Sequence, residues 1–352
     1  MKILLIGPQW MGGWLEGVLK PLRLLNHQVT PFYYDYPNAP TVVGNLVKVS
    51  SYAPKALRNY AEPIARNIGK TWEERMNRRL LSAAKKIKPD LVFILKGETI
   101  QAEILAELKK DSKYIVSWWL DDPILYFQTH PQVRLQLQYI DILFLFDRAK
   151  FQELQQLGAK QVQYLPCAFD PDVYHPKPTS PTDIKNYQCD IGMIASYYKK
   201  RGEILSAVQG LDVAIWGMGW RKSSELKQFP ARTLRGKSLT GRQIATAYNV
   251  IKICPNAHHS QSVLGGLNMR AFEIPGAGGF QITDYIEGME EHFEIGKEIV
   301  VYQSPQHFRE LVEYYLRHDD ERKALARRGY ERAIRDHTYE QRLKKIFEVL
   351  KS

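Results

Sequence analysis

Short, almost wholly apolar segments separated by helical patterns are the feature that most constrains the fold of this chain. They cover residues 2–6, 91–95, 114–119 and 142–146 in the first half, and residues 191–195, 213–216, 250–253, 280–282 and 299–302 in the second half. Near-continuous apolar runs of this length are typical of parallel strands that are buried on both faces. The sequence therefore predicts an α/β fold in which strands and helices alternate.

The same alternation occurs twice, which together with the length of 352 residues predicts two Rossmann-like domains. A polar, proline-rich segment over residues 168–186 separates the halves and is predicted to be a linker. Residues 1–167 then form an N-terminal domain, and residues 187–335 form a C-terminal domain. Ligands of parallel sheets gather at the carboxyl ends of the strands, so the two domains are expected to face each other across a cleft.

The end of the chain is predicted to be helical. Ser304 is a suitable N-cap and Pro305 suits a first helical turn. Two more helical patterns follow over residues 321–336 and 339–350.

The formal net charge is strongly positive, at +11. Such an excess favours anionic partners such as nucleotides, phosphorylated sugars, nucleic acid or a lipid surface. No segment approaches the ~20 apolar residues that a membrane span requires, and the apolar run over residues 3–6 is too short for a signal peptide. Cys167, Cys189 and Cys254 lack metal-binding spacing, which favours a reducing cytoplasm.

Many of the basic residues lie in a mostly helical stretch between about residues 45 and 90. This stretch is either a solvated helix face or a surface for an acidic acceptor or an anionic lipid. The predicted location is cytoplasmic, with peripheral contact to the inner face of the membrane as an open alternative.

The segment from Asn268 to Asp284 carries the clearest functional pattern. It is predicted to form a short helix with Arg270 and Glu273, then a glycine turn and an apolar strand. Residues at i and i+3 share a helix face, so a cation that suits phosphate lies beside a carboxylate that suits ribose hydroxyls. The glycines allow close approach of the backbone. The pattern predicts a nucleotide site, and a surface ion pair is the simpler alternative.

Three other segments in the C-terminal half follow predicted strands. The segment over residues 196–201 opens a helix whose N-terminus and adjacent cations suit a diphosphate. The segment over residues 216–220 carries an indole that can stack on a base, although an ordinary turn at the end of a strand explains this segment equally well. The segment over residues 255–260 has paired histidines without acidic or thiol partners at a recognisable spacing, so no metal site is predicted. The donor-side candidates are Ser196, Lys200, Arg201, Trp216, Gly217, Asn268, Arg270, Glu273, Gly278 and Gly279.

The first half offers candidates on the acceptor side. Its opening glycine turn lacks the spacing of the dinucleotide fingerprint, so a nicotinamide cofactor is not predicted. A carboxylate at the end of the strand over 114–119 can deprotonate an acceptor hydroxyl, whereas Asp122 can also simply initiate a turn before proline. The acceptor-side candidates are Trp10, Gly12, Gly13 and Asp121, and the candidate catalytic residues are Asp122, His259 and Arg270.

Taken together, these motifs resemble the CgeB-like (spore maturation protein) glycosyltransferases of the GT-B superfamily. The likeness covers most of residues 90–352 and is strongest after Asp190. It is carried by Ser196, Arg201 and residues 119–123, 165–170, 190–192, 216–220, 268–273, 278–280 and 337–342.

The resemblance implies an N-terminal acceptor domain, a C-terminal donor domain and a metal-independent transfer. Helix dipoles and basic side chains would neutralise the leaving diphosphate. Glu273 matches the ribose-binding carboxylate, and Lys200 and Arg201 lie where diphosphate ligands are expected. The last helix, within residues 336–352, is expected to cross back onto the N-terminal domain. In one departure, Gly265 occupies the place where many retaining members carry a second glutamate, so the stereochemistry is not predicted.

The resulting prediction is a glycosyltransferase that moves a sugar from a nucleoside-diphosphate sugar to a glycan, lipid-linked or protein acceptor. No further cofactor is expected, and no nucleic-acid recognition motif is present. The missing glutamate keeps a second hypothesis open, namely a non-catalytic nucleotide-sugar-binding or assembly protein of the same fold. An epimerase or phosphorylase of this architecture is a third, although no Schiff-base lysine for a pyridoxal enzyme is identified.

Overall fold

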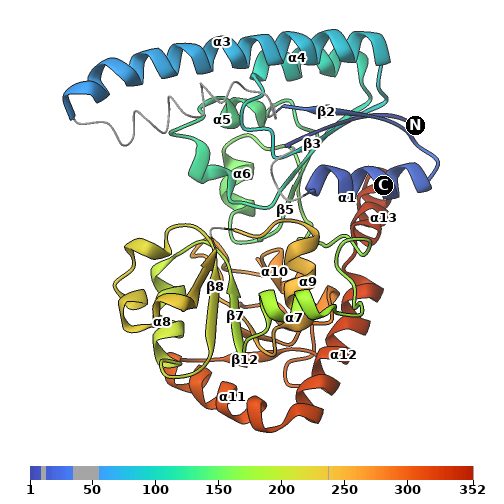
Figure 1. The fold of residues 1–352 in the computed structure, drawn as a ribbon. Coiled ribbons are helices and arrows are strands. Elements are labelled where there is room, and N and C mark those ends of the chain that lie inside the picture. Colours follow the sequence, from blue (N-terminus) through green and yellow to red (C-terminus); the bar gives the residue numbers. More distant parts are fainter. Residues whose placement is uncertain (9–12, 35–54, 237, 352) are drawn as a thin grey trace. The chain divides into compact units, whose positions relative to one another are not determined.

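The computed structural model describes residues 1–8, 13–34, 55–236 and 238–351, with side chains from residue 70 onward in the helix that begins at Lys55. Trp10 and Gly12 therefore lie outside the described residues. The chain forms two compact units, one of Met1–Leu145 with Lys150–Leu165 and one of Phe146–Ala149 with Pro166–Ser352. Both units are α/β with parallel strands, which confirms the predicted fold class (Figure 1).

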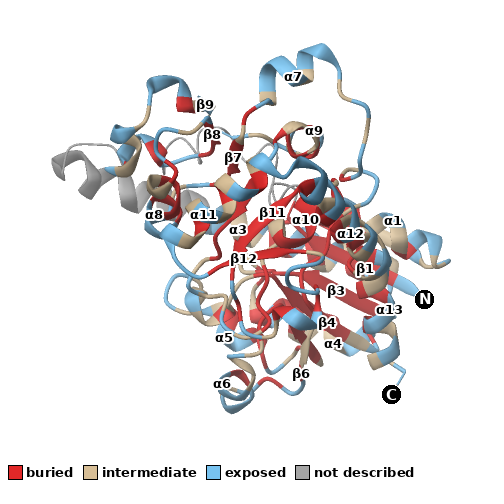
Figure 2. Ribbon diagram, turned by 90° about the horizontal axis from the view of Figure 1, so that it is seen from below, coloured by how far each residue is buried: buried red, intermediate tan, exposed pale blue. Residues whose placement is uncertain are grey.

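The first unit contains one six-stranded parallel sheet in the order β2-β1-β3-β4-β5-β6. Its strands are β1 (Lys2–Gly7), β2 (Gln28–Tyr33), β3 (Leu91–Leu95), β4 (Tyr114–Trp119), β5 (Ile142–Leu145) and β6 (Val162–Tyr164). The central strands are almost fully buried, as their apolar runs predict (Figure 2). Its helices are α1 (Trp14–Leu24), α3 (Lys55–Ile87), α4 (Ala102–Asp111), η1 (Pro123–Tyr126), α5 (Gln132–Gln136) and α6 (Phe151–Gln156).

The second unit contains two three-stranded parallel sheets, in the orders β7-β8-β9 and β10-β11-β12. Its strands are β7 (Ile191–Ile194), β8 (Val213–Trp216), β9 (Leu234–Gly236), β10 (Cys254–Asn256), β11 (Gln281–Asp284) and β12 (Val300–Tyr302). A parallel bridge between Ile191 and Ile253 joins the two sheets side by side, with the amide of Gly192 donating to the carbonyl of Ile253 at 3.0 Å.

One predicted strand, over residues 250–253, is wrong. Val250 is instead the last residue of helix α9 (Arg242–Val250), and the amide of Ile251 still donates to the carbonyl of Ala247. The strand proper begins at Cys254. A short apolar run has no periodicity that separates the end of a buried helix from the start of a strand.

Two helices of the second unit bear on predictions made from the sequence. The segment predicted as a linker, 168–186, contains most of α7 (Pro181–Tyr187), which starts with a capping box between Ser180 and Asp183. Ser304 caps α11 as predicted, accepting from the amide of His307. The helices are α7, α8 (Lys199–Ala207), η2 (Trp220–Lys222), η3 (Glu225–Gln228), η4 (Ala231–Thr233), α9, α10 (Arg270–Gly276), η5 (Met289–Glu291), α11 (Pro305–Arg317), α12 (Asp319–Asp336) and α13 (Tyr339–Val349).

The start of α13 is tied to the segment that enters the second unit. Arg342 is almost fully buried, and its guanidinium donates to the carbonyls of Pro166, Cys167 and Asp336. Part of the motif over residues 337–342 therefore has a structural role. The expected packing of α13 on the N-terminal domain stays a prediction. No helix in the described ranges is long and apolar enough to cross a membrane.

Candidate functional site

Arg270 lies at the start of α10 and is held by uncharged acceptors. Its Nε donates to the carbonyl of Ile194 at 3.1 Å, and its Nη1 donates to Oδ1 of Asn256 at 3.2 Å. Asn256 ends β10 and exchanges amide hydrogen bonds with Asn268, whose Oδ1 also accepts from the amide of Ala271 in the first turn of α10. Two asparagines thus orient the guanidinium at the carboxyl end of β7 and β10.

Arg201, in the first turn of α8, is a second cation of this site. It is only 4% exposed, and it donates to the carbonyls of Ala257 at 3.2 Å and Ser196 at 2.7 Å. Burial, followed by the charge of Arg270, lowers the pKa of Arg201 to about 9. Within the described residues neither arginine forms an ion pair with a carboxylate. Two adjacent cations with unused donors and no direct carboxylate partner suit an anion such as a diphosphate.

Glu273 also points inward, one turn along α10 from Arg270. It is 8% exposed, and the Tyr174 hydroxyl donates to it. Burial raises the pKa of Glu273, while Arg270 and Tyr174 act in the opposite direction. Among the described residues the two side chains form no ion pair, so the alternative of a surface ion pair is wrong. A buried carboxylate of this kind gains from hydroxyl donors such as those of a ribose.

Asp284, the last residue of β11, is the centre of a charged cluster that the sequence did not identify. It accepts from Nδ1 and the backbone amide of His258, at 2.6 and 3.1 Å, and from Nζ of Lys200 at 2.5 Å. His258 and Lys200 lower the pKa of Asp284 well below its ordinary value even though burial raises it. His258 is 2% exposed, and its Nε2 has no hydrogen-bond partner in the described chain. Lys200, by contrast, is half exposed.

The glycines after α10 lie against protein. A Cβ on Gly278, whose φ is +78°, would lie 2.9 Å from Pro176, and one on Gly279 would lie 3.1 Å from the carbonyl oxygens of Ile274 and Tyr248. The close approach that the sequence predicts is therefore made with the chain itself. Their ligand contact stays a prediction.

The end of β8 is similarly tight. A Cβ on Gly217 would lie 1.9 Å from the carbonyl oxygen of Ala195, so only glycine fits. Trp216 is 4% exposed and packs beside Tyr187 and Arg235. Little of its ring is therefore free to stack on a base. Ser196 is exposed, and its backbone carbonyl accepts a hydrogen bond from Nη1 of Arg201.

The loop before α10 explains the missing glutamate. Gly265 has φ of +74°, a conformation that a glutamate adopts only with strain. Next to it, a Cβ on Gly266 would lie 2.1 Å from Oδ2 of Asp147, which accepts from the amides of Val263 and Leu264 at 2.6 and 3.0 Å. A side chain at position 265 or 266 would therefore meet strain or a clash in this loop.

Among the predicted acceptor-side residues, Asp121 belongs to a partly buried network at the ends of β3 and β4. Nζ of Lys96 lies 3.0 Å from Asp121 and 3.7 Å from Glu98, and it donates to the Tyr126 hydroxyl at 2.9 Å. Burial alone would lower the pKa of Lys96, but Glu98 and Asp121 raise it overall. Sequence reasoning did not select Lys96, although its place directly after a buried strand was a usable signal.

The other candidate bases have local roles. Oδ1 of Asp122 accepts from the amide of Ile124 and caps η1, which is the turn-initiating alternative. The ring of His259 packs edge-on against Tyr198 at 4.8 Å. Gly13 precedes α1 with φ of +85°, a left-handed conformation that glycine adopts without strain. The described ranges contain no group of three or more side chains suited to a metal ion.

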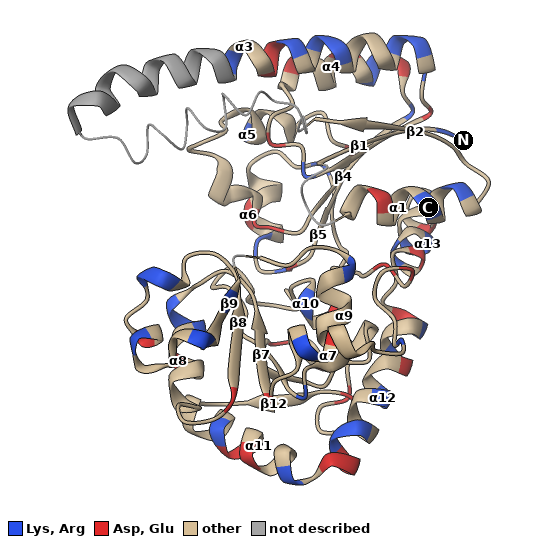
Figure 3. Cartoon of the chain, viewed as in Figure 1, with Lys and Arg blue, Asp and Glu red and all other residues tan. Residues whose placement is uncertain are grey.

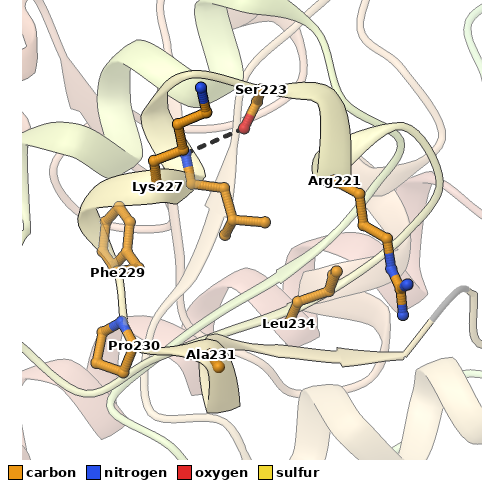
Figure 4. Close-up of a pocket in the computed structure, with 8 residues that line it drawn as sticks. Arg221, Ser223, Lys227, Phe229, Pro230, Ala231 and Leu234 are labelled. Atoms are coloured by element: carbon orange, nitrogen blue, oxygen red, sulfur yellow. Dashed lines mark hydrogen bonds between the residues drawn. The ribbon is translucent and has the colours of Figure 1, made fainter.

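A separate cavity of about 320 Å³ lies in the insert between β8 and β9 (Figure 4). The hydroxyl of Ser223 accepts from the amide of Leu226 at its edge. None of the predicted donor-site residues lines it. The lining residues are Arg221, Ser223, Leu226, Lys227, Phe229, Pro230, Ala231 and Leu234.

Comparison with known proteins adds sequence relatives. Residues 200–348 match a family model described as glycosyl transferase-like. Over 276 residues the chain is 22% identical to the spore protein CgeB of Bacillus subtilis (strain 168). This match covers 74% of this chain and 83% of that relative.

Solved structures share the fold over the whole chain. HepE of Anabaena, in complex with UDP and glucose, has a TM-score of 0.62 at 15% identity and covers 100% of this chain and 99% of its own. Sucrose-phosphate synthase from Thermosynechococcus elongatus has a TM-score of 0.62 at 12% identity, with 100% and 98% coverage. At these identities the likeness establishes the GT-B fold alone.

Proposed function

Because this chain is a CgeB homologue with a glycosyl transferase-like domain and the GT-B fold, we propose that it transfers a sugar from a nucleoside-diphosphate sugar. The observation that carries the proposal is the pair Arg201 and Arg270, two adjacent cations with unused donors and no carboxylate partner. A diphosphate would compensate both charges at once. Glu273, on the same helix as Arg270, is suited to the ribose hydroxyls.

The proposed reaction breaks the bond between the anomeric carbon and the diphosphate oxygen, and the electron pair stays on the diphosphate. The acceptor oxygen forms the new bond and gives up its proton. Arg201 and Arg270 stabilise the negative charge that grows on the leaving group, and this effect accelerates the step because it is stronger in the transition state. Lys200 adds a third cation when it turns from Asp284 toward the phosphates. Asp122 and His259 stay predictions for the proton acceptor.

UDP-glucose is the first donor to test, since HepE has been solved with it. The experiment measures the thermal midpoint of the chain with UDP, GDP, ADP and dTDP, and then the release of nucleoside diphosphate from the matching sugar nucleotides. We expect one diphosphate to raise the midpoint by preferential binding to the folded state. No rise with any of them would reject the proposed donor site.

Arg270→Ala provides the sharper test. Loss of charge-assisted hydrogen bonds worth about 1.5–3 kcal/mol should weaken nucleotide binding roughly 10–100-fold. Arg327→Ala is the matched control, because Arg327 is exposed on α12 and its one ion pair among the described residues is with Glu331 at 3.0 Å. Equal nucleotide affinity of the two variants would remove Arg270 from the site. Turnover that EDTA leaves unchanged would support transfer without a metal.

A second function is favoured by the loop at Gly265. Its left-handed backbone leaves no ordinary place for the sugar-contacting glutamate of retaining relatives. The alternative is a protein that binds the nucleotide sugar without transferring it. The same experiments separate the two, since this alternative predicts a nucleotide-dependent midpoint but no release of diphosphate.

A further inference from the structure

Most of the net positive charge of the chain lies in one short stretch. Residues 55–88 hold ten lysines and arginines against three glutamates, a net charge of +7 out of +11 for the whole chain. Nearly all of this stretch is the single uninterrupted helix α3. At 1.5 Å per residue its 33 residues span about 50 Å.

Five of the six cations of α3 with described side chains lie on one face, and Lys70 lies outside it. Met76, Leu80 and Ala84 recur every four residues, are buried and pack into the core of the first unit. The opposite arc, about 120° wide from the helical repeat, is exposed and basic. Figure 3 shows in blue the many Lys and Arg positions along this part of α3. This basic arc consists of Arg75, Arg78, Arg79, Lys85 and Lys86.

We propose that the basic arc of α3 docks the protein on an anionic membrane surface. A row of cations along one extended helix can meet a flat surface all at once, whereas a curved nucleic-acid backbone would meet only some of them. Each basic residue near an anionic bilayer contributes about 1 kcal/mol. From residue 70 onward, where the side chains of α3 are described, its apolar face is packed in the core of the first unit, so the attraction of this part to the lipid is electrostatic.

The test uses the full-length chain and co-sedimentation with vesicles of phosphatidylcholine alone or mixed with phosphatidylglycerol. We expect binding only to the mixed vesicles and its loss in high salt. Neutralising four arc residues (Arg75→Gln, Arg78→Gln, Lys85→Gln and Lys86→Gln) should weaken binding on the order of a hundredfold or more. Replacing both arginines by lysine, which keeps the charge, should preserve binding.

The matched control removes four exposed cations from the second unit, namely Lys323, Arg327, Arg335 and Lys344. Equal loss in the control would overturn the proposal, because net charge rather than the arc would then govern binding. Binding to phosphatidylcholine alone would also overturn it. Binding of the protein to duplex DNA but not to the mixed vesicles would overturn it as well. The nucleotide-dependent thermal midpoint should be the same in all variants, so failure of this proposal is distinct from failure of the donor site.

Discussion

At the scale of single residues, Glu273 places function and stability in opposition. Burial raises its pKa above the ordinary 4.5, so its ionisation destabilises the folded state as the pH rises through that range. Glu273→Gln should therefore unfold at an equal or higher temperature at neutral pH, yet lose the nucleotide-dependent rise. Thermal unfolding with and without the nucleotide measures both effects. The exposed Glu331→Gln serves as control, and a full nucleotide effect in Glu273→Gln would exclude the ribose role.

The pKa of Asp284 is shifted in the opposite direction to that of Glu273, so its ionisation stabilises the folded state. Since His258 and Lys200 lower its pKa, its stabilising effect is complete above the ordinary value of about 3.8 and is lost as the pH falls toward the lower folded value. Asp284→Asn should reduce the free energy of unfolding at neutral pH by about 3 kcal/mol, because it leaves buried donors unmatched. Asp190→Asn, which breaks the exposed pair with Lys252, should cost less than about 1 kcal/mol. Urea unfolding at pH 7 and pH 3 checks both, and equal losses at pH 7 would contradict the assignment.

At the scale of elements, the sequence predicts strands better than side-chain partners. The strands β3, β4 and β8 coincide with their predicted apolar runs, because a strand buried on both faces needs a continuous apolar sequence. The i and i+3 spacing likewise places Arg270 and Glu273 together on α10. By contrast, Asp284 and His258 meet because β10 and β11 are neighbours in the sheet. Such a contact depends on strand order, which no local pattern encodes.

Gly329 in α12 tests how packing between elements outweighs helix propensity. Propensity alone favours alanine in a helix by about 1 kcal/mol. A Cβ there would, however, lie 2.6 Å from the carbonyl oxygen of Glu298, a backbone atom that cannot turn aside. Gly329→Ala should therefore destabilise the protein by about 1–3 kcal/mol. Gly202→Ala in α8 meets movable side chains of Glu225 and Tyr197 and should cost less in the same denaturant titration; the reverse order would refute the packing argument.

At the scale of the whole molecule, the two units are interleaved along the chain. The sequence predicts a boundary at 167/168, whereas the second unit also includes Phe146–Ala149, which directly follows β5 of the first unit. Within this short segment, Asp147 accepts from the amides of Val263 and Leu264 in the loop before α10. The loop that precedes the candidate nucleotide site thus depends on residues far earlier in the sequence.

A chain limited to residues 166–352 should therefore hold this loop less firmly than the full protein. Without the Asp147 carboxylate, the amides of Val263 and Leu264 lose their acceptor, so their hydrogen exchange should accelerate and nucleotide binding should weaken. Asp147→Ala in the full chain removes the same two bonds while keeping everything else, and it should reproduce both effects. If the shortened chain protects these amides as well as the full protein does, the second unit folds independently of Phe146–Ala149, and the boundary predicted from the sequence is sufficient.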